Sequence, residues 1–297
     1  MENMFIKYSL AILFLPLAAF IVQIFFGKRL PRQGDWVSIS AIMVTLVLSV
    51  VMFVSMLLNY EPNFIQEDSF VWFDMGHFSI RLGFLIDNLT IIMLLVVALI
   101  STCTHIFSTQ YLKGDIRYSR YFAYLGLFTF SMNGIVLSNS LISMYIFWEL
   151  VGVSSYLLIG HWFEKESAAN ASKKAFLTNR VGDIGFFIGI MILYSAVGSF
   201  AFSEVFDGVS NGLISGSALT LAGFGLFMGA MGKSSQFPLH IWLPDAMEGP
   251  TPVSALMHAA TMVAAGVYLS VRIFPILTPD ALLIVAYVGG FTAIFAA

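Results

Sequence analysis

The stretch GLFMGAMGKSSQFPLHIWLPDA, residues 225–246, places Lys233 deep in an apolar run. Pro238 and Pro244 follow closely, and each removes a backbone donor and disturbs a helix. Freed backbone groups at membrane depth are tolerated only where they are buried in protein or line a wet cavity. A charged residue just before a broken helix is therefore the pattern expected of an ion path.

The composition of the whole chain is that of a membrane protein. Of its 297 residues, 59% are hydrophobic and only 10% are charged, whereas soluble domains average about 25% charged residues. Apolar runs recur that are each long enough to cross a hydrocarbon core about 30 Å thick. The one cysteine, Cys103, excludes a disulfide framework or a cysteine-based metal site within the chain.

We predict an all-α polytopic membrane protein of about nine transmembrane helices. The spans are predicted at residues 5–26, 36–58, 85–107, 119–138, 139–160, 174–198, 218–243, 252–274 and 281–297. Basic and non-basic loops alternate between them, so the positive-inside rule places the N-terminus outside. The basic cluster at 28–32 follows the first apolar run, which therefore predicts a retained membrane helix and not a signal peptide.

The loop after the second predicted span contains SFVWFDMGHFSIRLGFLID, in which apolar and polar residues alternate around Met75-Gly76. This pattern predicts a small external β-hairpin at about 68–84, with His77 exposed. Elsewhere, small residues four apart, at Gly185/Gly189 and Gly225/Gly229, favour close approach of membrane helices over nucleotide binding.

Two ionisable residues lie where charge is expensive. Glu149, in LISMYIFWELVGVSSYLLIG, is about ten residues from either end of its span and so near the bilayer midplane. A charge at a helix centre costs about 2.5 to 3.5 kcal/mol on insertion scales, so Glu149 and Lys233 are functional-site hypotheses. Burial disfavours the charged form, so both groups are expected to exchange protons. The bland alternatives are a structural hydrogen bond for Glu149 and snorkelling of Lys233 to an interface.

Four more residues join this candidate proton path. His258 lies about two turns into its span and can pass protons, although a lone histidine is also often a packing residue. Asp183 follows Arg180 by three residues, so the two can pair on one helix face or take part in proton uptake. Lys173 and Lys174 lie at the membrane edge, as positive-inside anchors or, for Lys174, as part of the uptake route.

These residues together suggest a mechanism. A proton would enter from the cytoplasmic side, pass through Lys233 and His258, and be driven electrostatically by Glu149. If ionised Glu149 approaches Lys233, the lysine keeps its proton, and if the pair separates, the proton leaves. Moving one charge across 100 mV corresponds to about 2.3 kcal/mol, which sets the scale of the work required.

Three segments resemble a known family: FWELVGVSSYLLIGHWF, NRVGDIGF and MGKSSQFPLHIWLPDAMEGPTPVSALMHAATMVAAGVYL. They are similar to the antiporter-like L subunit (subunit 5) of respiratory NADH:quinone oxidoreductase, complex I, a family related to Mrp-type antiporter subunits. The similarity runs over essentially the whole chain. It implies a proton half-channel built from an inverted helix repeat with a broken helix. It makes Glu149 the membrane glutamate, Lys233 the broken-helix lysine and His258 a relay residue, and it assigns Asp183 to the RVGD motif.

The resemblance also sets expectations for organisation and partners. Family members are about twice as long, so the chain is expected to be an N-terminal fragment. We divide it into N-terminal helices at 1–115, an antiporter-like repeat at 116–275 and the start of a second repeat at 276–297. No cofactor is expected in this chain, with FMN, iron–sulfur clusters and quinone in partner subunits. The expected partners are other membrane-arm subunits and the lipid bilayer, with no nucleic acid and no substrate other than protons. The expected location is a bacterial inner membrane.

Three functions remain open from the sequence. The first is a membrane-arm subunit of a proton-translocating NADH:quinone oxidoreductase, without a redox centre of its own. The second is an Mrp-type cation/proton antiporter subunit or a membrane-bound hydrogenase subunit, and NRVGDIGF favours the first over it. The third is a structural membrane subunit without an ion path. A soluble redox enzyme is excluded, because the sequence has no dinucleotide fingerprint, metal-ligand cluster or nucleophile constellation.

Overall fold

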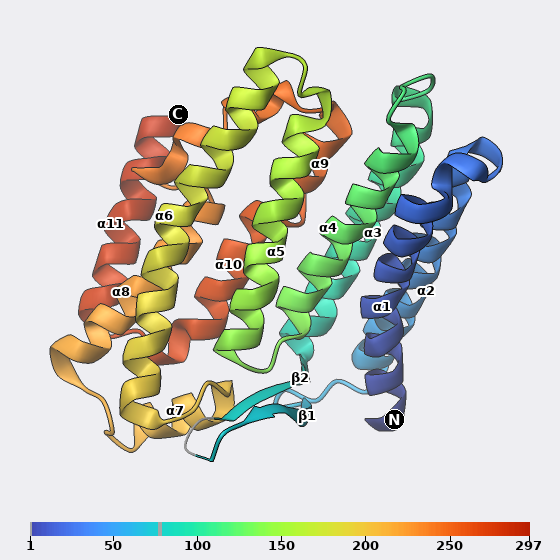
Figure 1. Ribbon diagram of the computed structural model, residues 1–297. Helices are drawn as coiled ribbons and strands as arrows, with labels where there is room; N and C mark the ends of the chain where they lie inside the picture. The colour runs from blue at the N-terminus through green and yellow to red at the C-terminus, as the bar shows by residue number, and fades with distance from the viewer. Residues whose placement is uncertain (1, 77–78) are drawn as a thin grey trace.

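The computed structural model describes residues 2–76 and 79–297, and most of them are helical (Figure 1). The helices are α1 (Glu2–Phe26), α2 (Asp35–Leu58), α3 (Asn88–Tyr111), α4 (Tyr118–Leu137), α5 (Leu141–Ile159), α6 (Glu166–Val197), α7 (Phe202–Ser210), α8 (Gly216–Lys233), α9 (Thr251–Ala259), α10 (Met262–Ile273) and α11 (Pro279–Ala296). Side-chain oxygens of Asp87, Ser140 and Thr278 accept the first free N–H groups of α3, α5 and α11, which fixes where these helices begin.

The long helices run up and down side by side, as Figure 1 shows. The N-terminus, the β-hairpin and α7 lie at one end of the bundle, and the C-terminus lies at the other. The turns between α1 and α2, α3 and α4, and α5 and α6 share the end that carries the C-terminus. These are the turns whose basic residues predict a cytoplasmic location, so the alternation of loops agrees with the fold. That this end faces the cytoplasm stays a prediction.

Seven helical segments among the described residues are long and apolar enough to cross a membrane, and one of them comprises α9 and α10 together. They correspond to seven of the predicted spans. The predicted spans at 119–138 and 218–243 correspond instead to α4 and α8, which do not meet that standard. The count of about nine spans therefore stays a prediction. α6 begins at Glu166, eight residues before the predicted span at 174–198, so Lys173 and Lys174, expected at the membrane edge, lie within the helix.

Strands β1 (Ile65–Asp74) and β2 (Ser79–Asp87) pair antiparallel, and the register shifts between Val71 and Phe73. They cover the predicted hairpin and extend beyond it at both ends. His77, which was expected to be exposed, lies outside the described residues. The placement of this sheet on the outer side of a membrane stays a prediction.

The segment quoted at the outset is helical only as far as Lys233. α8 ends there, and residues 234–250 continue as turns and the short 3-10 segments η4 (Leu239–Trp242) and η5 (Asp245–Glu248). The indole of Trp242 donates to the Gly232 carbonyl at 3.0 Å, which satisfies one of the free carbonyls at the end of α8. The break predicted from the two prolines therefore falls at the lysine itself.

A second break, which the sequence analysis did not predict, divides the span at 252–274. α9 ends at Ala259 and α10 begins at Met262, with no proline between them. The Thr261 hydroxyl donates to the Leu256 carbonyl at 2.8 Å and so replaces a lost helical bond. The Ser234 hydroxyl donates to the Val263 carbonyl at 2.8 Å, so the two helix breaks are adjacent.

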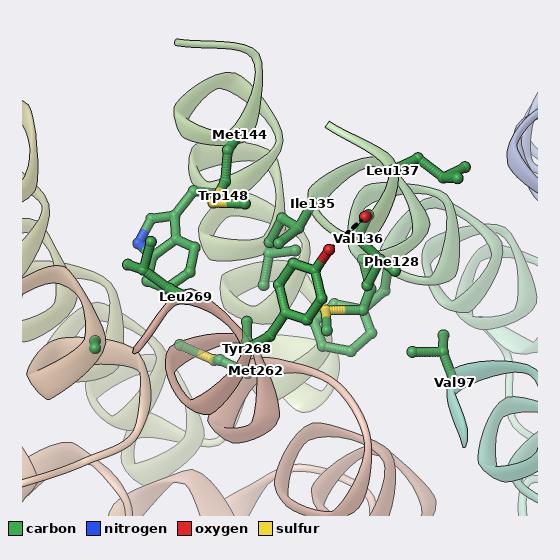
Figure 2. Close-up of a cluster of buried hydrophobic side chains, with 14 of the residues drawn as sticks. Val97, Phe128, Ile135, Val136, Leu137, Met144, Trp148, Met262, Tyr268 and Leu269 are labelled. Atoms are coloured by element: carbon green, nitrogen blue, oxygen red, sulfur yellow. Dashed lines mark hydrogen bonds between the residues drawn. The ribbon is translucent and has the colours of Figure 1, made fainter. Parts of the chain in front are cut away.

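A buried cluster of large side chains lies where α4, α5 and α10 meet (Figure 2). Trp148 of α5 packs there beside Met144 and Leu269, and all three are fully buried. The Tyr268 hydroxyl donates to the Val136 carbonyl at 2.7 Å, the dashed line in Figure 2. This packing fixes the position of the Trp148 indole, which reaches the polar site described next.

Candidate functional site

Lys233 is the last residue of α8, and its side chain is fully buried. Partial negative charge at a helix C-terminus favours a cation at this position. Gly152 of α5 faces the ammonium so closely that a Cβ there would lie 2.9 Å from Nζ. Nζ has no hydrogen-bond partner among the described residues. The glycine at position 152 therefore leaves space for the buried amine of Lys233, and this amine has no hydrogen bond to the described residues.

Asp183 of α6 supplies the carboxylate closest to this amine. Its Oδ2 lies 3.8 Å from Lys233 Nζ, and the aspartate is 2% exposed. Its Oδ1 accepts a hydrogen bond from Trp148 Nε1 at 2.8 Å. The ring centroid of Trp148 lies 5.9 Å from Nζ, within the range of a cation–π interaction. One indole thus contacts both members of the Asp183–Lys233 pair.

Glu149 of α5 forms an ion pair with Arg180 of α6. The Arg180 guanidinium also lies over the ring of Phe176, 4.7 Å from its centroid. This pair is less buried than the Asp183–Lys233 pair, because the Arg180 side chain is 38% exposed. The two pairs lie side by side, one between α5 and α6 and the other between α6 and α8.

The charged residues of the site pair with partners on neighbouring helices. Arg180 does not pair with Asp183, although the i, i+3 spacing allows it, because each finds its partner on a different neighbouring helix. Glu149 is held by Arg180, and the carboxylate beside Lys233 is that of Asp183. Sequence spacing along one helix did not reveal these contacts, which depend on how three helices pack.

Lys174 lies apart from this cluster. Its Nζ is 2.7 Å from Asp245 Oδ2, and Lys165 forms a similar pair with Glu248 at 2.6 Å. Both pairs join α6 to η5 and line a hollow of about 860 Å³. Hydrogen bonds from Lys165 and Ser167 hold the pKa of Glu248 below its usual range. These pairs attach the irregular segment after Lys233 to the N-terminal part of α6.

His258 also lies apart, at the end of α9 next to the second break. It is half-buried, and its Nε2 has no hydrogen-bond partner among the described residues. The structure therefore brings together Glu149, Arg180, Asp183 and Lys233, and it leaves Lys174 and His258 outside the cluster. The roles of all six in proton transfer stay predictions.

The sequence analysis missed Trp148 and Gly152 as members of the site. Both are on α5 with Glu149, and their spacing of four places them on one helix face. A tryptophan next to a buried glutamate was the available signal, since buried indole N–H groups usually find a partner. Within the described residues, no group of three or more His, Cys, Asp or Glu side chains could hold a metal ion.

Comparisons with known proteins place this arrangement in a family. Residues 138–297 match the family model described as NADH:quinone oxidoreductase/Mrp antiporter, TM. Residues 72–122 match the model for the N-terminus of complex I chain 5.

Two relatives illustrate the similarity. NAD(P)H-quinone oxidoreductase subunit 5, chloroplastic, from Anthoceros angustus is 49% identical over 269 residues, which is 87% of this chain and 37% of the relative. F(420)H(2) dehydrogenase subunit L from Methanosarcina mazei is 44% identical over 313 residues, 98% of this chain and 45% of the relative. The chain thus spans less than half the length of these curated relatives.

Solved structures share the fold. The chain resembles part of the Mrp complex from Dietzia sp. DQ12-45-1b, with a TM-score of 0.74 and 24% identity over 89% of this chain and 27% of the other. It also resembles part of the membrane-bound sulfane sulfur reductase, an archaeal respiratory membrane complex, with a TM-score of 0.77 and 19% identity. That match covers 91% of this chain and 53% of the other.

Proposed function

The chain belongs to the NADH:quinone oxidoreductase/Mrp antiporter family, and from this premise we propose that it is a proton-translocating part of the membrane arm of such an oxidoreductase. Electron transfer to quinone would occur in partner subunits that carry FMN and iron–sulfur clusters, and this chain would carry protons. The observation that carries the proposal is the buried Lys233 amine, 3.8 Å from Asp183 and without a hydrogen bond. The two relatives named above differ in electron donor, NAD(P)H or F420H2, which suits a subunit that does not bind the donor.

The four clustered residues have separate parts in the proposed mechanism. Lys233 gains and loses the proton, and Asp183 stabilises its charged form. Glu149 is neutralised by Arg180, so it adds little negative charge near the lysine while that pair persists. When Arg180 moves away, the freed carboxylate favours a proton on Lys233. When Arg180 turns toward Asp183, it disfavours that proton by charge repulsion. Lys174 and the hollow beside it lie on the proposed uptake route, and His258 on the route onward.

The domain division and the location extend this proposal. Residues 116–275 form the repeat with the proton path, after N-terminal helices at 1–115 and before a further repeat beginning at 276–297. The chain is an integral multi-pass membrane protein, as its apolar helices and its family indicate. A bacterial inner membrane stays a prediction, because matching relatives include chloroplast proteins.

The decisive experiment uses the full-length gene product in its complex, in inverted membrane vesicles. Lys233→Ala is expected to abolish most of the NADH-driven ΔpH and to lower NADH oxidation with it, because a coupled enzyme slows when its proton path is blocked. Lys173→Ala is the matched control, since this lysine is exposed on α6, and it should leave both rates within about twofold. Undiminished pumping and oxidation in Lys233→Ala would show that the buried lysine is structural.

The same vesicles distinguish this proposal from the alternative function, that of an Mrp-type antiporter. An Mrp-type antiporter predicts sodium-dependent ΔpH dissipation that needs no NADH and is lost in Lys233→Ala. The likeness to the Mrp complex supports this candidate at the level of fold.

A further inference from the structure

A pocket outside the buried charge cluster lies between the α1–α2 turn and the α3–α4 turn. It has a volume of about 380 Å³ and is lined by Arg32, Gln33, Asp35, Thr109, Gln110, Lys113, Gly114 and Tyr118. Both turns are at the end of the bundle that carries the basic loops, at its α1–α2 edge (Figure 1). The pocket therefore lies where the apolar part of a membrane meets its headgroups.

The charge of this region suits an anion. Residues 27–35 and 109–118 carry five basic side chains and two acidic ones. Asp35 is already neutralised, because Arg32 Nη2 at 2.8 Å and the Tyr118 hydroxyl at 2.9 Å both donate to its Oδ2. Lys113 is exposed and has no acidic partner among the residues that the structure describes. Lys113 and the outer face of Arg32 are thus available to a phosphate.

The backbone of the α1–α2 turn has an unusual conformation at two successive residues. Arg32 and Gln33 both have a φ of 55°, in the left-handed region that residues other than glycine seldom adopt. Such conformations persist only where the surroundings enforce them, and they are common where a ligand is held. Here the Arg32–Asp35–Tyr118 contacts hold the turn over the start of α4. The positive-inside rule accounts for basic residues at this end but not for a shaped pocket.

The surroundings are those of a lipid and not of free phosphate. Trp36 is 49% exposed beside the pocket, and Ile116 in the facing turn is 89% exposed. Aromatic side chains at this depth are typical of the membrane interface. Below the pocket, α1 and α2 present exposed apolar side chains, including Phe25, Val47 and Val54. In a phospholipid, the phosphate would bind in the pocket and the acyl chains would lie against the exposed apolar side chains of α1 and α2.

The polar lining narrows the choice of headgroup. Besides the basic side chains, the pocket is lined by Thr109 and by the amides Gln33 and Gln110. Hydroxyl and amide groups can donate to and accept from a hydroxyl, which favours a headgroup with free hydroxyls. We propose that this pocket binds the headgroup of an anionic, hydroxyl-bearing phospholipid of the phosphatidylglycerol type, with its phosphate on Lys113 and Arg32.

Local photo-crosslinking tests the proposal in the complex that contains the full-length chain. The complex is placed in nanodiscs with photoactivatable phosphatidylglycerol or, in parallel, photoactivatable phosphatidylcholine at equal mole fraction. Adducts are quantified by mass spectrometry in the peptide that contains residues 109–118. Phosphatidylglycerol is expected to give several-fold more adduct there than phosphatidylcholine. Lys113→Gln should reduce that adduct about fivefold, the effect of one basic side chain at a membrane surface.

Lys28→Gln is the matched control, because Lys28 lies at the same end but outside the pocket, and the adduct should fall clearly less than in Lys113→Gln. Equal adducts from the two lipids, or no effect of Lys113→Gln, would overturn the proposal. Loss of the adduct in excess inorganic phosphate would identify a free-phosphate site instead. Absence of lipid adducts in this peptide would show that a partner protein covers the pocket. Because proton pumping is not the readout, none of these outcomes depends on the proposed function.

Discussion

At the scale of single residues, Trp148 is the side chain that joins the parts of the site. Its N–H bonds to Asp183, its ring faces Lys233, and its neighbour in the chain is Glu149. Hydrophobic packing against α4 and α10 fixes its position (Figure 2). The geometry of the Asp183–Lys233 pair thus depends on a residue that carries no charge.

Trp148→Phe is therefore expected to impair proton translocation while preserving the fold. The ring contact with Lys233 is retained, but the hydrogen bond to a carboxylate is lost, which is worth about 1.5 to 3 kcal/mol. We expect NADH-driven ΔpH formation to slow by about tenfold or more, with the pH profile of pumping displaced.

The matched control for this variant is Tyr118→Phe. The Tyr118 hydroxyl also donates to a carboxylate, that of Asp35 at 2.9 Å, but it lies outside the charge cluster and the hollow beside Lys174. Pumping in this control should remain near normal. An equal loss in both variants, with an unchanged pH profile, would mean that Trp148 acts only in packing.

The identities of the charged site residues could be predicted from the sequence, but their pairings could not. Lys233 and Glu149 stand out because charge in an apolar run is costly wherever the helix packs. Their partners depend on which faces of α5, α6 and α8 meet. The spacing of residues along a single helix does not specify these contacts between helices. The Arg180–Asp183 pair, which the spacing allowed as one alternative, does not form for this reason.

At the scale of elements, α6 and α8 pack through a line of glycines. A Cβ at Gly182 would lie 2.7 Å from the Met228 carbonyl oxygen, and a Cβ at Gly225 would lie 2.8 Å from the Gly185 carbonyl oxygen. The sequence spacing of small residues predicted this close approach. It did not predict the second helix break, because a break between Ala259 and Met262 has neither proline nor glycine to mark it.

Gly182→Ala is expected to force α6 and α8 apart next to Lys233. Overpacking of this kind costs about 1 to 3 kcal/mol, so the thermal stability of the assembled complex should fall. Pumping should fall as well, because the added methyl group would also push on the residue before Lys233. The same Cβ would lie 3.1 Å from the Cα of Gly232.

Gly289→Ala on α11 is the control for this variant. A Cβ there meets no atom within 4 Å, and alanine is favoured over glycine in a helix by about 1 kcal/mol. This substitution should leave stability unchanged or raise it. If Gly182→Ala behaved in the same way, the close packing of α6 on α8 would be disproved.

At the scale of the whole molecule, a buried ion pair ties the N-terminal helices to the segment after the helix breaks. Asp87, at the start of α3, pairs with Arg272 of α10, and a second contact joins Arg272 Nη2 to Asp87 Oδ1 at 3.2 Å. Tyr268 and Thr90 complete the network around the guanidinium, which is 7% exposed. The sequence analysis placed Asp87 within a span and missed this link.

Asp87→Asn is expected to destabilise the complex strongly, by about 3 to 5 kcal/mol, because it leaves the buried Arg272 without a counter-charge. Thermal unfolding of the complex in detergent measures this loss. Lys165→Gln is the control, since its pair with Glu248 is largely exposed and should contribute at most about 1 kcal/mol. Equal effects of the two substitutions would contradict this reading.

The contribution of Asp87 to the free energy of unfolding is expected to decrease at acidic pH. Burial raises the pKa of Asp87, but the hydrogen bond and the charge of Arg272, together with hydrogen bonds from Thr90, outweigh this effect and hold the pKa below its usual value of 3.8. A carboxylate with a lowered pKa contributes its full stability above its unfolded pKa, and the contribution is lost as the pH falls through the folded pKa. The difference between the parent protein and Asp87→Asn should therefore be constant from neutral pH to about pH 5 and shrink only below pH 4.

In the proposed mechanism, the separation of 3.8 Å between Lys233 and Asp183 sets how far the two helices would move to change the proton affinity of the lysine. It is about 1 Å longer than a charge-assisted hydrogen bond, so the ammonium has no direct bond to break before its proton departs. A slide of α8 along α6 by about that amount would form the bond and hold the proton. On this proposal, a partner subunit that drives the cycle would have to move α8 by only about 1 Å relative to α6.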